Sequence, residues 1–157
     1  MGQLGARADR KARLSDPAVR AELQEIVEEF KESPKDLRLA VLLDFANNLP
    51  AVPDTIDRDA LEQVHECQTP FFVAAEVDAD GRVHLHFDAP PEAPTTRGYA
   101  GVLAAGLSGA TVEEILDTPA DFFVGMGLAE LISPLRLRGM GAILARVKRQ
   151  VVEKSGA

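Results

Sequence analysis

Residues 71–88 constrain the fold of this chain most, because their hydrophobic pattern repeats every two residues. Residues 71–77 are rich in aromatic and branched side chains, and the Asp-Ala-Asp-Gly run at 78–81 has the composition of a tight turn. Apolar and polar residues then alternate, with apolar side chains at Val83, Leu85 and Phe87. Because strand side chains point alternately to two faces, we predict an antiparallel hairpin with one buried face.

Helical periodicity precedes the hairpin. The Ser-Asp-Pro run at 15–17 predicts a helix start. The apolar residues that follow it at helical spacing are Val19, Leu23, Ile26, Val27 and Phe30. The Ser-Pro pair at 33–34 predicts a second helix, which ends near Asn47. Its expected apolar face consists of Leu37, Val41 and Phe45. We expect residues 57–64 to form a short helical segment.

Helical patterns return after the hairpin. Three prolines in residues 89–96 predict an extended connection, and residues 97–107 predict a helix whose glycines and alanines pack closely against the sheet. Residues 111–114 match a capping box, and further helices are expected to begin at 118–119 and 133–134. Helices on either side of a small antiparallel sheet predict an α+β fold, with the helices covering one face of the sheet.

Composition bounds the domain organisation and the partners. The chain has 157 residues, 46% of them hydrophobic, so we expect one globular domain at residues 14–157 behind a mobile, basic arm at residues 1–13. A formal net charge of -8 argues against nucleic acid. The longest apolar run, residues 100–107, is too short to span a bilayer, and no signal-peptide pattern precedes the domain. We therefore expect a cytoplasmic protein with protein partners.

The single cysteine, Cys67, lies just before the hairpin. One thiol forms no intramolecular disulfide and cannot by itself hold zinc or an iron-sulfur cluster. Its thiolate is a nucleophile, and its polar neighbours His65, Glu66, Gln68 and Thr69 indicate a site outside the apolar core. Free cysteines are usually inert core residues, so the residue alone favours an inert cysteine over a reactive one. A single free thiol agrees with a reducing compartment.

The histidines raise the question of a metal. His84 and His86 point to the same polar side of the predicted strand, and with His65 and Cys67 they could be imagined as a metal site. Polar side chains opposite a core-facing stripe are, however, typical of any half-buried strand. We predict no bound metal.

Three motifs, in order, resemble those of SufE-type cysteine desulfuration proteins, which accept sulfur for iron-sulfur cluster assembly. Residues 66–73, Glu-Cys-Gln-Thr-Pro-Phe-Phe-Val, resemble the family's Gly-Cys-Gln-Ser segment. Residues 92–98 resemble its acidic-Ala-Pro segment ahead of Arg-Gly, and residues 133–139 resemble its Ser-Pro-Ser-Arg run and following glycine. The resemblance covers residues 34–150. The positions that depart from the family pattern are Glu66 for glycine, Thr69 for serine, Phe72 for tryptophan and Leu135 for serine.

The resemblance implies a compact fold shared with IscU-type scaffold proteins. It implies that Cys67 takes persulfide sulfur from a SufS-type cysteine desulfurase and stimulates that enzyme. Pyridoxal phosphate and C–S bond cleavage would belong to the partner, so this chain would be neither an enzyme nor a cofactor protein. A cluster scaffold complex is the expected recipient, and a monomer or weak homodimer the expected state. The residues expected to shape the site or dock the partner are His65, Glu66, Gln68, Glu92 and Arg136.

Two other functions stay open at this point. Cys67 could be the nucleophile of a thiol peroxidase or hydrolase with His65 as its base, although nucleophile and base usually come from separate segments. Alternatively, the cysteine could be inert in a binding module. Arg136 is expected to support sulfur transfer, whereas Arg146, further along the same helix, is expected to affect neither sulfur transfer nor thermal stability.

Overall fold

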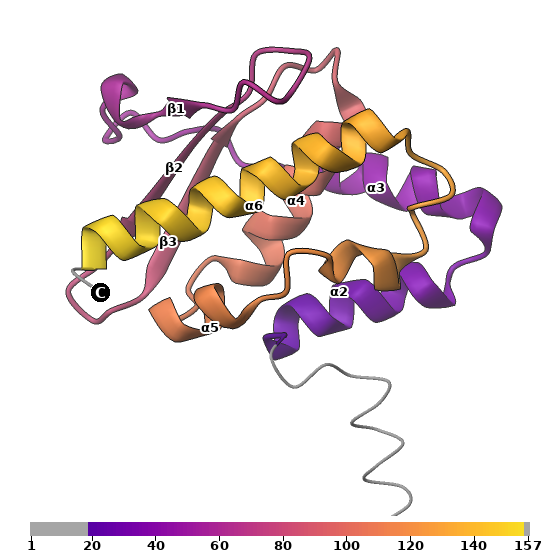
Figure 1. Ribbon diagram of the computed structural model, residues 1–157, viewed down its shortest axis with the longest axis horizontal. Coiled ribbons are helices and arrows are strands. Elements are labelled where there is room, and N and C mark those ends of the chain that lie inside the picture. The colour runs from indigo at the N-terminus through magenta and orange to yellow at the C-terminus, as the bar shows by residue number, and fades with distance from the viewer. Residues whose placement is uncertain (1–18, 156–157) are drawn as a thin grey trace, which may run out of the picture.

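The computed structural model describes residues 19–155 (Figure 1). Its α-helices are α2 (Ala21–Glu32), α3 (Arg38–Asn47), α4 (Pro94–Leu107), α5 (Val112–Asp117) and α6 (Pro134–Ser155). Its 3-10 helices are η1 (Lys35–Leu37), η2 (Arg58–Ala60) and η3 (Phe122–Met126). Its strands are β1 (Glu62–Gln63), β2 (Phe72–Val77) and β3 (Val83–Asp88), and they form an antiparallel sheet in the order β1-β2-β3. The predicted α+β fold is confirmed.

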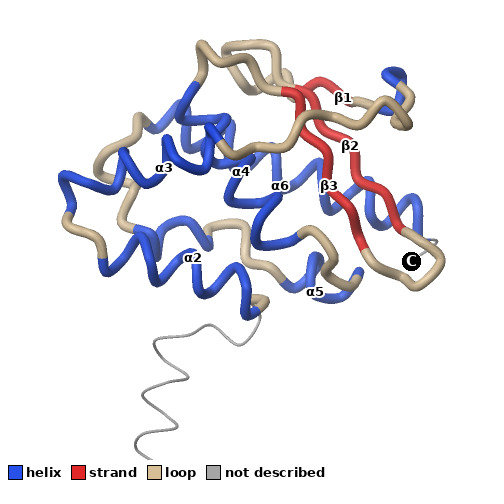
Figure 2. The backbone as a smooth tube through the Cα atoms, turned by 180° about the vertical axis from the view of Figure 1, so that it is seen from behind, coloured by secondary structure: helices blue, strands red, loops and turns tan. Residues whose placement is uncertain are grey.

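The predicted hairpin is formed by β2 and β3. Val73 lies opposite Phe87 and Ala75 opposite Leu85, and all four side chains are buried. Gly81 has a φ of 78° in the turn, a left-handed conformation that glycine adopts without steric cost. Helix α6 packs against β2, and α4 packs against β3. Helix α6 crosses in front of the sheet in Figure 1 and behind it in Figure 2, so the helices cover one face as predicted.

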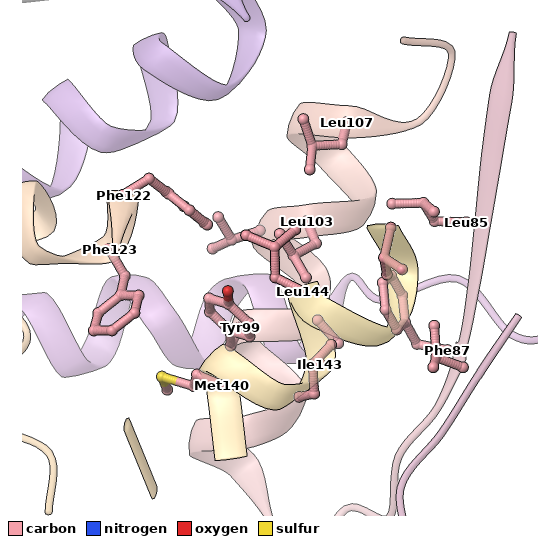
Figure 3. Packing of buried hydrophobic residues seen from close by; sticks show 14 of the residues in the cluster. Leu85, Phe87, Tyr99, Leu103, Leu107, Phe122, Phe123, Met140, Ile143 and Leu144 are labelled. Atoms are coloured by element: carbon pink, nitrogen blue, oxygen red, sulfur yellow. The ribbon is translucent and has the colours of Figure 1, made fainter. Parts of the chain in front are cut away.

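The core surrounds α4, which contacts α2, α3, α6 and β3. Figure 3 shows Leu103 of α4 beside Leu144 of α6, both in the middle of the cluster. Tyr99 stacks on Phe122 of η3, with 5.9 Å between ring centroids. All these side chains except Phe122 are at most 1% exposed, so α4 lies at the centre of the core.

Glycines let α4 approach α3 closely. A Cβ at Gly98 would lie 2.5 Å from the carbonyl oxygen of Leu42, and one at Gly101 would lie 2.3 Å from that of Phe45. Both distances are far inside van der Waals contact with a backbone atom that cannot easily move. The glycines therefore serve helix-helix packing, whereas the sequence suggested packing against the sheet.

This close approach decides which face of α3 is buried. Leu42 and Ala46 are buried, whereas Leu37 is 50% exposed and Val41 and Phe45 are only partly covered. The buried face is thus rotated by one residue, about 100°, from the predicted one. The sequence of α3 is apolar on both sides, so its own periodicity could not select the face that meets α4.

The start of the first described helix differs from the prediction. Residues 15–17 lie outside the described residues, as does the predicted arm at 1–13, and α2 begins only at Ala21. Arg20 is not helical. Its guanidinium instead donates to the carbonyl oxygens of Gly106 and Ser108, at 3.3 and 3.1 Å. Contact with the end of α4 therefore fixes the backbone before α2.

Three further boundaries were predicted wrongly. The helix expected to begin at 118–119 is the 3-10 helix η3, which begins at Phe122. Helix α4 begins at Pro94, three residues before the predicted start, because the fixed φ of proline suits the first turn of a helix. Residues 57–64 form one 3-10 turn followed by a strand, since β1 pairs with β2 at Val73 and Phe72. Within residues 19–155, no helix is long and apolar enough to cross a membrane.

Candidate functional site

Cys67 lies on the loop between β1 and β2, residues 64–71, which we call the thiol loop. The backbone N–H of Val64 donates to the carbonyl of Phe71 at 2.8 Å and closes the base of the loop. Both side chains are fully buried, and the Phe71 ring packs 6.0 Å from that of Phe87. The N–H of Cys67 donates to the Val64 carbonyl at 3.2 Å, which makes a tight turn. The half-buried thiol therefore sits near the tip of a loop whose base is anchored in the core.

A small pocket of about 70 Å³ opens beside the thiol. Its walls come from the thiol loop, from the connection between β3 and α4 with the first turn of α4, and from the first turns of α6. The predicted site residues that line it are Glu66, Cys67, Gln68, Glu92 and Arg136. The three sequence motifs, which are far apart along the chain, thus meet around one cysteine.

Gly139 allows α6 to pass close to the thiol. A Cβ at this position would lie 3.3 Å from Sγ of Cys67 and 3.7 Å from the carbonyl oxygen of Glu66. The same motif also starts the helix, because Oγ of Ser133 accepts a hydrogen bond from the backbone N–H of Arg136 at 3.3 Å. One short stretch of sequence therefore begins α6 and places its first turns against Cys67.

Arg97 holds the wall that carries Glu92. Its Nε donates to the carbonyl of Ala46 at 2.9 Å, and one terminal nitrogen donates to the carbonyl of Ala89 at 2.6 Å. These bonds tie the end of α3 and the end of β3 to the start of α4. The Arg-Gly part of the second motif is therefore structural, with Gly98 packed against α3 as described above, while Glu92 at its other end reaches the pocket.

The surroundings of Cys67 keep its thiol protonated. Partial burial raises the pKa of the thiol above its ordinary value, and the neighbouring Glu66 carboxylate raises it further. The positive charge of Arg146 opposes both effects, but the net shift is upward. Because an unperturbed thiol already has a pKa of about 8.5, Cys67 is a thiol and not a thiolate at neutral pH in this conformation.

Arg146, which the sequence analysis set aside, lies against the thiol loop. Two of its guanidinium nitrogens donate to the two carboxylate oxygens of Glu66, at 2.7 and 3.3 Å. Its Nε lies 3.1 Å from a carboxylate oxygen of Glu62, an ion pair whose N–H direction falls outside hydrogen-bond geometry. The spacing could have found it: Arg146 follows Gly139 by seven residues, so both lie on the same face of α6.

The three histidines, His65, His84 and His86, do not line the pocket beside the thiol. His65 is exposed on the thiol loop and lies outside the pocket. Nε2 of His84 lies 2.8 Å from Asp78, and Nε2 of His86 lies 2.8 Å from Glu76. In the part of the chain that the structure describes, no group of three or more His, Cys, Asp or Glu side chains could hold a metal ion.

Comparison with known proteins agrees with the motifs. The family model described as "SufE: Fe-S metabolism associated domain" matches residues 24–151. An uncharacterized SufE-like protein of Mycobacterium tuberculosis is 52% identical over 133 residues, which cover 85% of this chain and 93% of that protein. SufE-like protein 1, chloroplastic/mitochondrial, of Arabidopsis thaliana is 31% identical over 132 residues, covering 83% of this chain and 34% of that protein.

A solved structure supports the same relationship. The solution structure of a hypothetical protein from Thermus thermophilus matches with a TM-score of 0.80 and 45% sequence identity. The match covers 88% of this chain and 99% of that one. The resemblance found in the sequence is thereby confirmed, and the chain belongs to the SufE family, whose domain is associated with Fe–S metabolism.

Proposed function

We propose that this protein is a sulfur acceptor and carrier for iron-sulfur cluster assembly. Cys67 takes persulfide sulfur from a SufS-type cysteine desulfurase, and the protein thereby stimulates that enzyme. The observation that carries the proposal is the half-buried thiol beside a pocket that all three SufE motifs line. Membership of a family associated with Fe–S metabolism supports it.

The transfer is a thiol-disulfide exchange. The Cys67 thiolate attacks the terminal sulfur of the persulfide on the desulfurase. A new S–S bond forms to Cys67, the S–S bond of the donor breaks, and the donor cysteine leaves as a thiolate. The terminal sulfur keeps its proton, so Cys67 ends as a persulfide without any outside oxidant or reductant. Because the resting thiol is protonated, it must lose this proton in the complex before it attacks.

The size of the pocket favours a carrier over an enzyme with a substrate of its own. Small-molecule sites usually have volumes of about 300–1,000 Å³, whereas this pocket has about 70 Å³. That space suits one added sulfur atom, and enclosure protects a persulfide from oxidation. A thiol peroxidase or hydrolase with His65 as its base gains no support, because His65 lies outside the pocket.

The partner assignments are part of the same proposal. Glu92 and Arg136 are exposed charged residues at the pocket, where a docking desulfurase would meet them together with Gln68. We assign pyridoxal phosphate to the desulfurase and no cofactor to this chain, with a cluster scaffold complex as the recipient. The protein would act as a monomer or weak homodimer in the cytoplasm, where a single free thiol stays reduced.

Desulfurase turnover tests the proposal. Cysteine consumption by a SufS-type enzyme from the same source is measured alone, with the wild-type protein and with the Cys67→Ser variant. Serine preserves the side-chain size but removes the soft nucleophile, so only the wild type should stimulate turnover. Equal stimulation by the serine variant would contradict the acceptor mechanism, and it would also leave room for an inert cysteine in a binding module.

A further inference from the structure

One face of α6 runs along the thiol loop and the sheet. Gly139, Arg146 and Gln150 recur at spacings of seven and four residues, which places them on one side of a helix. Gly139 contacts the thiol loop. At the other end, the Gln150 side chain accepts from the N–H of Ala75 at 2.8 Å and donates to the carbonyl of Val73 at 3.2 Å. The stripe thus joins the thiol loop to β2, with Arg146 in the middle.

Arg146 makes a charged contact between α6 and the thiol loop. Its paired hydrogen bonds to Glu66 have the fork geometry that arginine forms with a carboxylate. The Arg146 side chain is only 21% exposed, so solvent screens this pair less than an ordinary surface pair. Glu62, its second partner, is held in turn by Arg149 and Gln150. The guanidinium is therefore fixed from both sides.

We propose that Arg146 is a positioning residue for Cys67, because through Glu66 it holds the thiol loop against α6 and sets how readily the thiol reacts. This inference deepens the proposed function and rests on it only for the identity of the sulfur donor. The contact depends on the side chain of Glu66. A glycine leaves the backbone free, whereas this glutamate adds a side chain by which the loop is held.

The charges around the thiol agree with this role. Glu66 faces Cys67 from the thiol loop, Glu92 from the connection between β3 and α4, and Arg136 and Arg146 from α6. Of these, Glu66 raises the pKa of the thiol and Arg146 lowers it. A Glu66 carboxylate released from Arg146 would act on the thiol unopposed. The pair therefore limits the penalty for ionisation that the glutamate imposes.

Alkylation of Cys67 by iodoacetamide, measured against pH, tests the proposal without any desulfurase. Arg146→Ala should move the midpoint of the rate profile to higher pH. At high pH, where Cys67 is fully ionised, the alkylation rate of this variant reaches a plateau. This plateau should be about two- to fivefold higher than in the wild type, because the loop is no longer held by an ion pair. Arg146→Lys should move the midpoint part of the way back to the wild-type value, since the positive charge returns. Its plateau rate should stay high, since an ammonium cannot form the paired hydrogen bonds.

Arg138→Ala is the matched control, because Arg138 is an exposed arginine of the same helix that lies outside the pocket and is not among the groups that shift the pKa of Cys67. If the Arg146→Ala protein has the same midpoint and plateau as this control, the proposal is wrong, and a shift in either quantity supports it. Should Arg146→Ala fail to fold by circular dichroism, Glu66→Gln breaks the same contact from the other side and should move the midpoint to lower pH. Sulfur acceptance can succeed or fail independently of these results.

Discussion

Sγ of Cys67 lies so close to Gly139 of α6 that a Cβ there would come within 3.3 Å of the sulfur. Few real Cβ atoms have a contact this short, so a side chain at position 139 would require the thiol or the helix to shift by a few tenths of an ångström. The pocket beside the thiol includes Gly139 in its lining. The space next to the sulfur is therefore set by a helix that begins five residues earlier, at Pro134.

The first prediction concerns this space. Gly139→Ala should fold, because the gain in helix propensity of up to about 1 kcal/mol offsets the crowding. It should take up sulfur more slowly, since the new methyl group occupies the room beside Sγ of Cys67. Gly141→Ala is the control, because a Cβ at Gly141 meets nothing within 4 Å. Mass spectrometry of samples taken during incubation with a desulfurase gives both rates, and equal rates would refute the role of this space.

The second prediction concerns pH. Because the pKa of Cys67 is raised, its alkylation midpoint should lie above the value of about 8.5 for a free thiol. A group whose pKa is higher in the folded state stabilises the fold fully below the unfolded pKa, and this contribution is lost as pH rises through the folded pKa. The wild type should therefore lose thermal stability relative to Cys67→Ser as pH rises above about 8.5. A midpoint below that of free cysteine would show that the site favours the thiolate.

The third prediction separates docking from stability. Arg136→Ala should lower sulfur transfer markedly with little change in the melting temperature, because the side chain is exposed at the pocket. Arg138→Ala is the comparison, since Arg138 is an exposed arginine of the same turn that lies outside the pocket. Arg146 cannot serve as that control, because it binds Glu66. Equal transfer by the Arg136 and Arg138 variants would remove the role assigned to Arg136.

The fourth prediction concerns the attachment of α6 to the sheet. Gln150 is 4% exposed and pairs with two backbone groups of β2. Gln150→Ala leaves these groups buried without that partner, so the free energy of unfolding should fall by about 1–3 kcal/mol. Arg149→Ala removes two more exposed ion pairs, to Glu62 and Glu153, and should lose about 1 kcal/mol or less. Urea denaturation measures both, and a similar loss for the two variants would show that Gln150 is not the main attachment.

The sequence predicted those parts of the fold that local pattern determines. The hairpin of β2 and β3 has both the two-residue period and the turn composition, and the capping box at Thr111 is present as predicted. Strand β1 was missed because two residues carry no periodicity and pair only through β2. The buried face of α3 was misplaced because Gly98 and Gly101, more than fifty residues further along the chain, decide which side of that helix is covered.

The same distinction applies to the site. The motif residues around Cys67 could be named in advance because the resemblance marks them. Arg146 was set aside because a basic residue on an amphipathic helix is usually solvated and its partner Glu66 lies 80 positions away in the chain, so only its spacing from Gly139 pointed to it. His65 was named for its nearness in sequence, but the turn of the thiol loop leaves it outside the pocket.

The most direct test of the central claim is peptide mapping after sulfur transfer. The wild-type protein is incubated with a persulfide-loaded SufS-type desulfurase. The products are then trapped with iodoacetamide and digested, and the mass of the peptide that contains Cys67 is measured by mass spectrometry. We predict that this peptide gains the mass of one sulfur atom while the cysteine peptide of the desulfurase loses the same mass. A desulfurase that gives up its sulfur while the Cys67 peptide gains nothing would contradict the proposal that Cys67 is the acceptor.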